Sequence, residues 1–480
     1  MNKKQLLAVG AAALLLFSCS FEGDLGSSST FWTLNFQNNR HVSINAQLLA
    51  EGRHCIIWAE KGVGVSVEQA QRVASQFDNV IFPRLIAGFS PEGGINDPET
   101  GEIFENIMEW ASGDDQGRLT ILLLRIRDGY DPPDNRSFVA GYFSSLDFFD
   151  APFSNRRDII YIDTKVQRPD SSAAYETIAH EMQHLMNFAF TLLYRTGSSY
   201  INYMDTWVDE GLSAAAEWVY SREYSETSLR WYARDTAFFQ GLSGLISQGN
   251  NFYAWNSRAN EDPYAILDDY ATVYLFFQWL RLQEGRSSVY SDIISSPFPD
   301  YRSVVNAMSG YNNWANMLRD WLAANYINAP DGPHGYLNEP RLRDIQAPIM
   351  TSTTGYASLY PGEGVYSRVL QGGSISSSPS DGPNIRYAGL GDAGLSTATT
   401  TTGGALLTYN INTNENGNRE SGTLASVSAG TSSIDTAPAR SAAPSRPFAI
   451  SAGDMLRRNG HEQNHELDVA RLIERLRNRE

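Results

Sequence analysis

Cysteine is nearly absent from this chain of 480 residues, which contains two, Cys19 and Cys55. Because Cys19 falls in a leader-like segment, the folded body has no cysteine pair from which to build a disulfide framework. Basic residues are also scarce: Lys and Arg number 37 against 54 Asp and Glu, and the formal net charge is −17. A chain this acidic lacks the basic face that attracts nucleic acid or an anionic membrane surface. We therefore expect neither to be its main partner.

Long apolar runs are missing as well, apart from a short one at 6–17 that follows a basic start. It is too short to cross about 30 Å of hydrocarbon as a helix, and no later stretch is longer, so it is typical of a secretory signal. The run ends in Ser18-Cys19, which resembles a bacterial lipobox. We predict a signal peptide over 1–18, a lipidated tether over 19–30 that begins at Cys19, and an exported protein. A lipid anchor would be its only attachment to the outer membrane or cell surface; the alternative is simple secretion with Cys19 unmodified.

Apolar side chains are plentiful, with 42% hydrophobic and 12% aromatic residues, enough for a sizeable core. Short apolar runs predict strands, a 3.6-residue periodicity predicts helices, and Cys55, which stands among apolar residues, is expected to be a buried free thiol. We predict an α+β fold with a main domain over 31–349, a small β domain over 350–430, and a disordered linker with a charged helix over 431–480. The expected elements are strands at 55–58, 120–124, 158–163 and 405–411, helices at 67–77 and 272–282, and a helix-rich block over 173–326.

The motif that indicates chemistry is His180-Glu181-Met182-Gln183-His184, an H-E-x-x-H sequence. On a helix, His180 and His184 lie one turn apart on one face, so both imidazoles can bind one metal ion. Glu181 points elsewhere and can act as general base on a metal-activated water. The motif therefore predicts a metal site, preferably zinc.

A third ligand is needed, and Glu210 is the best candidate. It follows Trp207-Val208, which can dock a second helix beside the first, and Gly211 next to it allows close helix approach. Asp205 is a plausible N-cap for that helix. The alternative for Glu210 is a solvated helix acid, and for Glu217 that alternative is preferred.

A second H-E-x-x-H sequence, His461-Glu462-Gln463-Asn464-His465, stands near the C-terminus. Arg457 and Arg458 precede it and Glu466 follows it, so nothing nearby could bury a metal ion. We interpret this segment as a surface helix start.

The sequence His180-Glu181-Met182-Gln183-His184 followed by Trp207-Val208-Asp209-Glu210-Gly211 resembles gluzincin zinc metallopeptidases, in particular the hyicolysin-type family and spirochaete lipoproteins with this pattern. The resemblance implies a zincin-like domain with a mixed sheet, an active-site helix and a helical lower lobe. It also implies one Zn²⁺ per chain, bound by His180, His184 and Glu210, with Glu181 as base and proteins or peptides as substrates. The aminopeptidase signature G-x-M-E-N is absent, which favours an endopeptidase. Ala214 stands where thermolysin-like enzymes carry an Asp, so the partner of the histidines is unassigned.

Three residues are candidates for the group that stabilises the tetrahedral intermediate. Tyr270 lies near the position that gluzincin aminopeptidases use for a catalytic tyrosine, and we prefer it to Tyr274 and His334. The expected function is thus that of a lipid-anchored zinc endopeptidase. The alternative is an inert surface binding or adhesion protein that retains the fold and works through its C-terminal β region. The sequence gives no basis for an oligomeric state.

Overall fold

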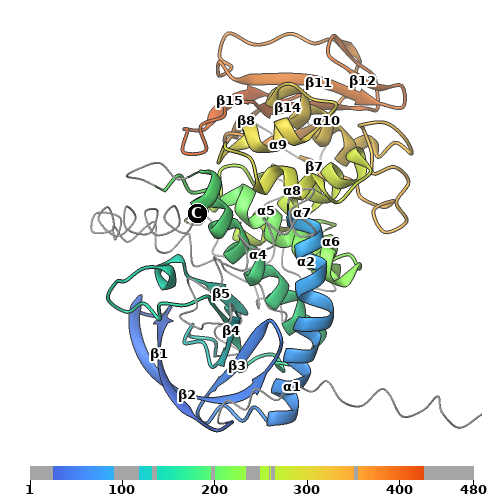
Figure 1. Ribbon diagram of the computed structural model, residues 1–480. Coiled ribbons are helices and arrows are strands. Elements are labelled where there is room, and N and C mark those ends of the chain that lie inside the picture. Colours follow the sequence, from blue (N-terminus) through green and yellow to red (C-terminus); the bar gives the residue numbers. More distant parts are fainter. Residues whose placement is uncertain are drawn as a thin grey trace, which may run out of the picture.

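The computed structural model describes residues 25–90, 118–131, 138–195, 201–233, 249–258, 260, 265–350 and 355–425. The signal peptide, Cys19 and the second H-E-x-x-H segment lie outside the described residues, as does the predicted linker with its charged helix. Figure 1 shows a sheet at one end of the molecule, helices in the middle and a second group of strands at the other end.

The N-terminal sheet has six strands in the order β1-β2-β3-β4-β6-β5. β3, β4 and β6 are parallel neighbours, whereas the other pairs are antiparallel. The strands predicted at 55–58, 120–124 and 158–163 are confirmed as β3, β4 and β6. β1 begins at Ser28, inside the range predicted for the tether, because its first residues pair with β2. The bounds are β1 Ser28–Asn35, β2 Arg40–Glu51, β3 Cys55–Glu60, β4 Leu119–Leu124, β5 Gly141–Phe143 and β6 Ile159–Asp163.

Helices cover one face of this sheet, and the alternation of side chains along each strand separates two cores. Ile121 and Ile160 pack with the helices, whereas Leu122 and Ile159 pack with Phe31 on the other face. The helix predicted at 67–77 is confirmed as α1, and Cys55 is a buried free thiol as expected. The covering elements are α1 Val67–Gln76, the π-helical η1 Phe77–Ile81, α2 Phe82–Phe89 and α4 Ser172–Tyr194, and the 3₁₀ turn η2 Ser145–Phe148 follows β5.

The helical block is organised around α7, Ala265–Glu284, whose residues are buried on nearly every side up to Leu280. A helix that is apolar all round is a central helix, and this agrees with the apolar helix predicted at 272–282. None of the described helices is long and apolar enough to cross a bilayer. The other helices of the block are α5 Thr206–Ser221, α6 Glu226–Tyr232, α8 Val289–Ile294, α9 Tyr301–Ala307 and α10 Trp314–Ile327.

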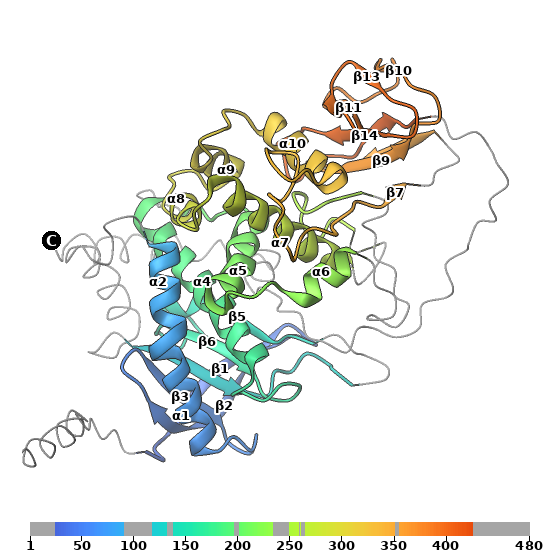
Figure 2. The ribbon, with the colours of Figure 1, turned by 90° about the vertical axis from the view of Figure 1, so that its right-hand side faces the viewer.

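The C-terminal strands lie against α10 (Figure 2). Tyr366 donates a hydrogen bond of 2.8 Å to the carbonyl of Leu322, and a Cβ at Gly364 would lie 2.6 Å from the Leu322 side chain. This sheet therefore shares its inner core with the helical block, and the α+β class is confirmed. Its main sheet has the order β12-β11-β14-β9-β7, beside the pairs β8–β15 and β10–β13. The bounds are β7 Ile349–Met350, β8 Tyr356–Leu359, β9 Gly364–Arg368, β10 Gly373–Ser374, β11 Ile385–Gly391, β12 Gly394–Ser396, β13 Thr399–Thr400, β14 Ala405–Asn410 and β15 Glu420–Thr423.

Candidate metal centre

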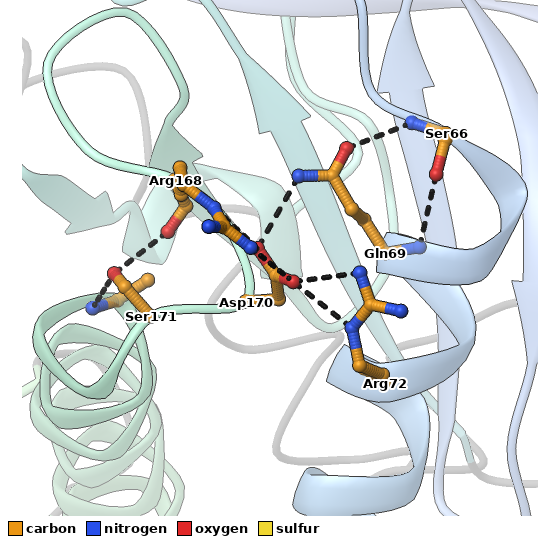
Figure 3. Close-up of polar contacts among 7 residues, drawn as sticks. Ser66, Gln69, Arg72, Arg168, Asp170 and Ser171 are labelled. Atoms are coloured by element: carbon orange, nitrogen blue, oxygen red, sulfur yellow. Dashed lines mark hydrogen bonds and ion pairs between the residues drawn. The ribbon is translucent and has the colours of Figure 1, made fainter.

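The start of α4 is fixed to α1 by one carboxylate, Asp170 (Figure 3). Its oxygens accept hydrogen bonds from Gln69 at 3.2 Å, from Arg72 at 2.9 Å and from Arg168 at 3.0 Å. Burial alone would raise the pKa of Asp170, but these donors outweigh it and hold the pKa below its usual range. The next residue, Ser171, caps α4 by accepting a backbone N–H of the first turn at 3.2 Å. The helix that carries the H-E-x-x-H motif is thus anchored at its N-terminus.

The structure brings the three predicted metal ligands together. His180 and His184 lie one turn apart on α4, are 1% and 2% exposed, and have ring centroids 4.9 Å apart. Glu210 of α5 is 1% exposed, and its Oε2 lies 3.5 Å from Nε2 of His180 and 3.6 Å from Nε2 of His184. One nitrogen or oxygen from each of the three residues lies within 4.8 Å of the others.

The same three atoms show that the site suits a cation. Nε2 of His180, Nε2 of His184 and Oε2 of Glu210 are all buried and have no hydrogen-bond partner. Buried polar atoms without partners cost about 1–3 kcal/mol each, so a native chain rarely keeps three of them side by side. Two imidazoles and one carboxylate around one point form the donor set of a catalytic metal site with an open position. These residues therefore form a possible metal site.

The charged groups of the metal site shift the pKa values of their neighbours toward the ionised forms. Burial would raise the pKa of Glu210, but His184 and His180 outweigh it and lower the pKa to about 2. Burial would likewise lower the pKa of His180, but the carboxylates of Glu210 and Glu217 raise it to about 9. Glu210 is thus a carboxylate at neutral pH, the form that binds a metal.

Carboxylates also hold the outer nitrogens of both histidines. Oε1 of Glu217 lies 3.0 Å from Nδ1 of His180, and Oδ1 of Asp209 lies 3.1 Å from Nδ1 of His184. Ser213 adds a hydroxyl 3.0 Å from the same His184 nitrogen. The expectation that Glu217 is a solvated helix acid is therefore wrong, because its side chain turns toward α4 and is only 27% exposed. The partners of the histidines, unassigned from the sequence, are Glu217, Asp209 and Ser213.

Glu181 lies against the sheet beside the three ligands. Its side chain is fully buried, and neither carboxylate oxygen has a hydrogen-bond partner. Burial raises its pKa to about 7, although His180 and His184 oppose this. A Cβ at Gly141 of β5 would lie 3.1 Å from Cγ of Glu181. The glycine therefore lets the edge strand approach the helix at this residue.

The three candidates for stabilising the intermediate lie in different places. The Tyr270 ring centroid lies 6.5 Å from that of His180. The hydroxyl of Tyr274 instead accepts the backbone N–H of Ser225 at 2.8 Å, and the ring is buried, which is a structural role. His334 follows Gly332, whose carbonyl accepts a hydrogen bond from Gln283. Gln283 is about 20 Å along α7 from Tyr270 at 1.5 Å per residue, so His334 is at the wrong end of the helix.

The packing of α5 differs in part from the expectation. Trp207 is fully buried, and the aromatic rings that it packs on, Phe252, Phe276 and Trp314, come from the helical block beyond α5. A Cβ at Gly211 would lie 2.1 Å from Cε2 of Phe277, so the close helix approach that this glycine allows is with α7. Asp205 stands at the N-cap of α5 but makes no side-chain capping hydrogen bond there.

Comparison with known proteins gives one relative of named activity. No family model matches the chain. The neutral metalloprotease ShpI of Staphylococcus hyicus is 24% identical over 332 residues, which cover 67% of this chain and 67% of that protein. This similarity and the buried His180, His184 and Glu210 cluster together support a metal-dependent protease.

Proposed function

We propose that this chain is an exported, lipid-anchored zinc endopeptidase that hydrolyses peptide bonds with Glu181 as general base. The observation that carries the proposal is the convergence of three buried ligand atoms, none with a hydrogen-bond partner, beside a buried carboxylate that also lacks one. A hydrolase needs a proton acceptor beside its cation, and the buried Glu181 carboxylate is placed to be one, whereas an inert binding protein has no such need.

Zinc is the metal that suits the donor set best. His180 and His184 would supply nitrogen and Glu210 oxygen, the combination of many zinc peptidases. When bound, zinc supplies a Lewis acid that polarises the scissile carbonyl and lowers the pKa of water. Glu217 and Asp209 would keep Nε2 of each histidine free to bind the cation, because each carboxylate would accept a hydrogen bond from the Nδ1–H.

Glu181 would move the proton. Its carboxylate is buried beside the ligands with neither oxygen engaged in a hydrogen bond, so it could take a proton from the attacking water and return it to the leaving amine. Tyr270 would donate a hydrogen bond to the oxyanion that develops on the substrate carbonyl. We assign Tyr270 this role because its ring lies 6.5 Å from that of His180, whereas Tyr274 supports Ser225 and His334 lies beside Asp320.

The edge strand β5 is the natural place for a substrate backbone. Among the described residues no strand pairs with its outer edge. Tyr142 pairs with Tyr161, and the carbonyl of Ala140 accepts the N–H of Asp163. The alternation of an antiparallel ladder then turns the backbone groups of Gly141 and Phe143 outward. A peptide added along this edge would pass Gly141, the position at which the strand approaches Glu181.

Cleavage of an internally quenched peptide with both ends blocked tests the proposal. The purified protein should cleave it, lose activity with a chelator and regain activity when zinc is added. Metal analysis should give about one zinc per chain. Zinc retention without cleavage of casein or of the blocked peptides would instead support an inert binding protein.

A further inference from the structure

Residues 249–258, called the strap below, join the C-terminal sheet to the first turns of α7. At one end, Asn250 exchanges backbone hydrogen bonds of 2.8 and 3.3 Å with Gly364, the first residue of β9. Further along, the carbonyl of Ser257 accepts the Tyr360 hydroxyl at 3.1 Å. The strap is therefore held by residues from the C-terminal sheet and the turn before it.

A buried ion pair strengthens this attachment. Arg258 of the strap pairs with Glu363, and their side chains are 7% and 0% exposed. The other oxygen of Glu363 accepts the backbone N–H of Tyr360 at 2.7 Å. A Cβ at Gly249 would lie 2.0 Å from Oε1 of Glu363, so the strap is shaped around this carboxylate. Two charges buried in this way hold a defined geometry only while both are present.

The other side of the strap is fixed to α7. Asp269 accepts the backbone N–H of Asn256 at 2.6 Å and the side-chain amide of Asn251 at 3.2 Å. Between these two attachments, the Trp255 ring meets the Tyr270 ring edge-on, with centroids 5.0 Å apart. Tyr270 is the residue after Asp269, and its ring also lies 6.5 Å from that of His180.

We propose that the Arg258–Glu363 pair positions Tyr270 by fixing the strap that presses Trp255 against it. The C-terminal sheet is then part of the active-site scaffold and not a separate binding module. Arg258 and Glu363 are positioning residues, because neither contacts the metal ligands. The inference rests on the proposed peptidase function, in which Tyr270 contacts the substrate oxyanion.

The first test replaces both charges at once, with Arg258→Met and Glu363→Leu. Replacing both partners of a buried pair with apolar residues is often neutral for stability, whereas removing one partner leaves the other charge buried and unpaired. We expect zinc content to stay close to that of the unmodified protein and the melting temperature to fall only slightly, because the Tyr360 N–H also loses its Glu363 acceptor. KM should change little, and kcat should fall by roughly 10–100-fold. Unchanged kcat would overturn the proposal.

A double-mutant cycle tests whether the effect passes through Tyr270. In a Tyr270→Phe background, the same double replacement should lower kcat by less than about twofold, because the group that it positions is already missing. Independent, multiplicative losses would show that the pair acts by another route. Glu420→Gln is the matched control, because Glu420 binds Asn384 within the C-terminal region, away from the strap.

Hydrogen exchange tests the strap without any need for peptidase activity. Peptides that cover residues 249–258 should exchange at least about tenfold faster in the double replacement than in Glu420→Gln, because the segment loses the Arg258–Glu363 attachment that limits its local opening. If the unmodified protein cleaves no peptide, the proposed function fails but this measurement still decides the structural part. Equal exchange in both variants would overturn it.

Discussion

Glu217 holds Nδ1 of His180 across 3.0 Å, although the two residues lie on different helices and are 37 positions apart. Asp209, which lies earlier than Glu217 on α5, is the partner of His184, which lies later than His180 on α4. The two helices therefore run antiparallel with their polar faces in contact. A carboxylate at the outer nitrogen fixes both the tautomer and the orientation of an imidazole. The geometry of the two histidines is thus set by the helix that also carries Glu210.

Replacing Glu210 and Glu217 in turn should distinguish the metal ligand from the residue that only orients a ligand. Glu210→Ala should weaken zinc affinity by orders of magnitude, because only two protein ligands remain. Glu217→Ala should weaken it by roughly 10–100-fold, the usual cost of losing the partner of a ligating histidine. Competition with a chromophoric chelator measures both. A larger loss in Glu217→Ala than in Glu210→Ala would move the ligand assignment to Glu217.

Replacing Glu181 should leave the zinc content unchanged and greatly slow peptide hydrolysis. Glu181→Gln keeps the shape of the side chain but cannot accept a proton, so peptide hydrolysis should fall by roughly 10²–10⁴ or more. Zinc content should stay near one per chain. Glu176→Gln, on the same helix but partly exposed, is the control and should keep its activity. Full activity in Glu181→Gln would exclude it as the base.

Replacing the two tyrosines of α7 should change different properties of the protein. Tyr270→Phe should lower kcat by roughly 10²–10³, the loss that follows removal of one oxyanion donor, with little change in melting temperature. Tyr274→Phe should lower stability by about 1 kcal/mol, because it leaves the partly buried N–H of Ser225 without its acceptor. Kinetics and thermal unfolding of both variants test the assignment. The reverse pattern would make Tyr274 the catalytic residue.

The hydrogen bonds that Asp170 accepts from Gln69, Arg72 and Arg168 should contribute a stability that depends on pH. Because the folded state holds the pKa of Asp170 below its usual range, its contribution is present above the unfolded pKa of about 4 and is lost as the pH falls through the folded value. Asp170→Asn should therefore lower the urea midpoint at pH 7, and the difference should shrink below about pH 4. Asp150→Asn is the control, because the Asp150–Arg156 pair is exposed on both sides. An equal change in both variants would contradict a special role for Asp170.

The second H-E-x-x-H sequence should not matter for metal binding. His461→Ala combined with His465→Ala should leave zinc content and activity unchanged, because the charged flanks of that segment cannot bury a cation. Metal analysis and peptide cleavage test this. Loss of the bound zinc would reverse the choice of motif.

The sequence predicts the parts that depend on local pattern. The runs that became β4 and β6, the long helix α7 and the pair His180 and His184 all follow from periodicity within one element. The prediction for Glu217 was wrong because its helix is partly polar, so the inward face can be identified only once one residue, such as Glu210, is placed on it. A signal existed: Glu217 lies two helical turns after Glu210, so both face α4 if either does.

Contacts between distant elements could not be predicted. Trp207 was expected beside α4, but its partners Phe252 and Trp314 come from later parts of the chain, and no local pattern selects between apolar neighbours. The strand pattern at 405–411 was confirmed as β14. That this sheet shares a core with α10 and attaches to the strap depends on pairings such as Tyr366 with Leu322.

Gly211 has no side chain, yet it sets the distance between α5, which carries Glu210, and α7, which carries Tyr270. Since a side chain there would collide with Phe277, even alanine would push α5 from α7 and separate Glu210 from Tyr270. Relatives of this chain can therefore lose activity while every metal ligand and the base remain in their sequences. In a search for inactive relatives, the residue after the ligand glutamate would be as informative as the ligands themselves.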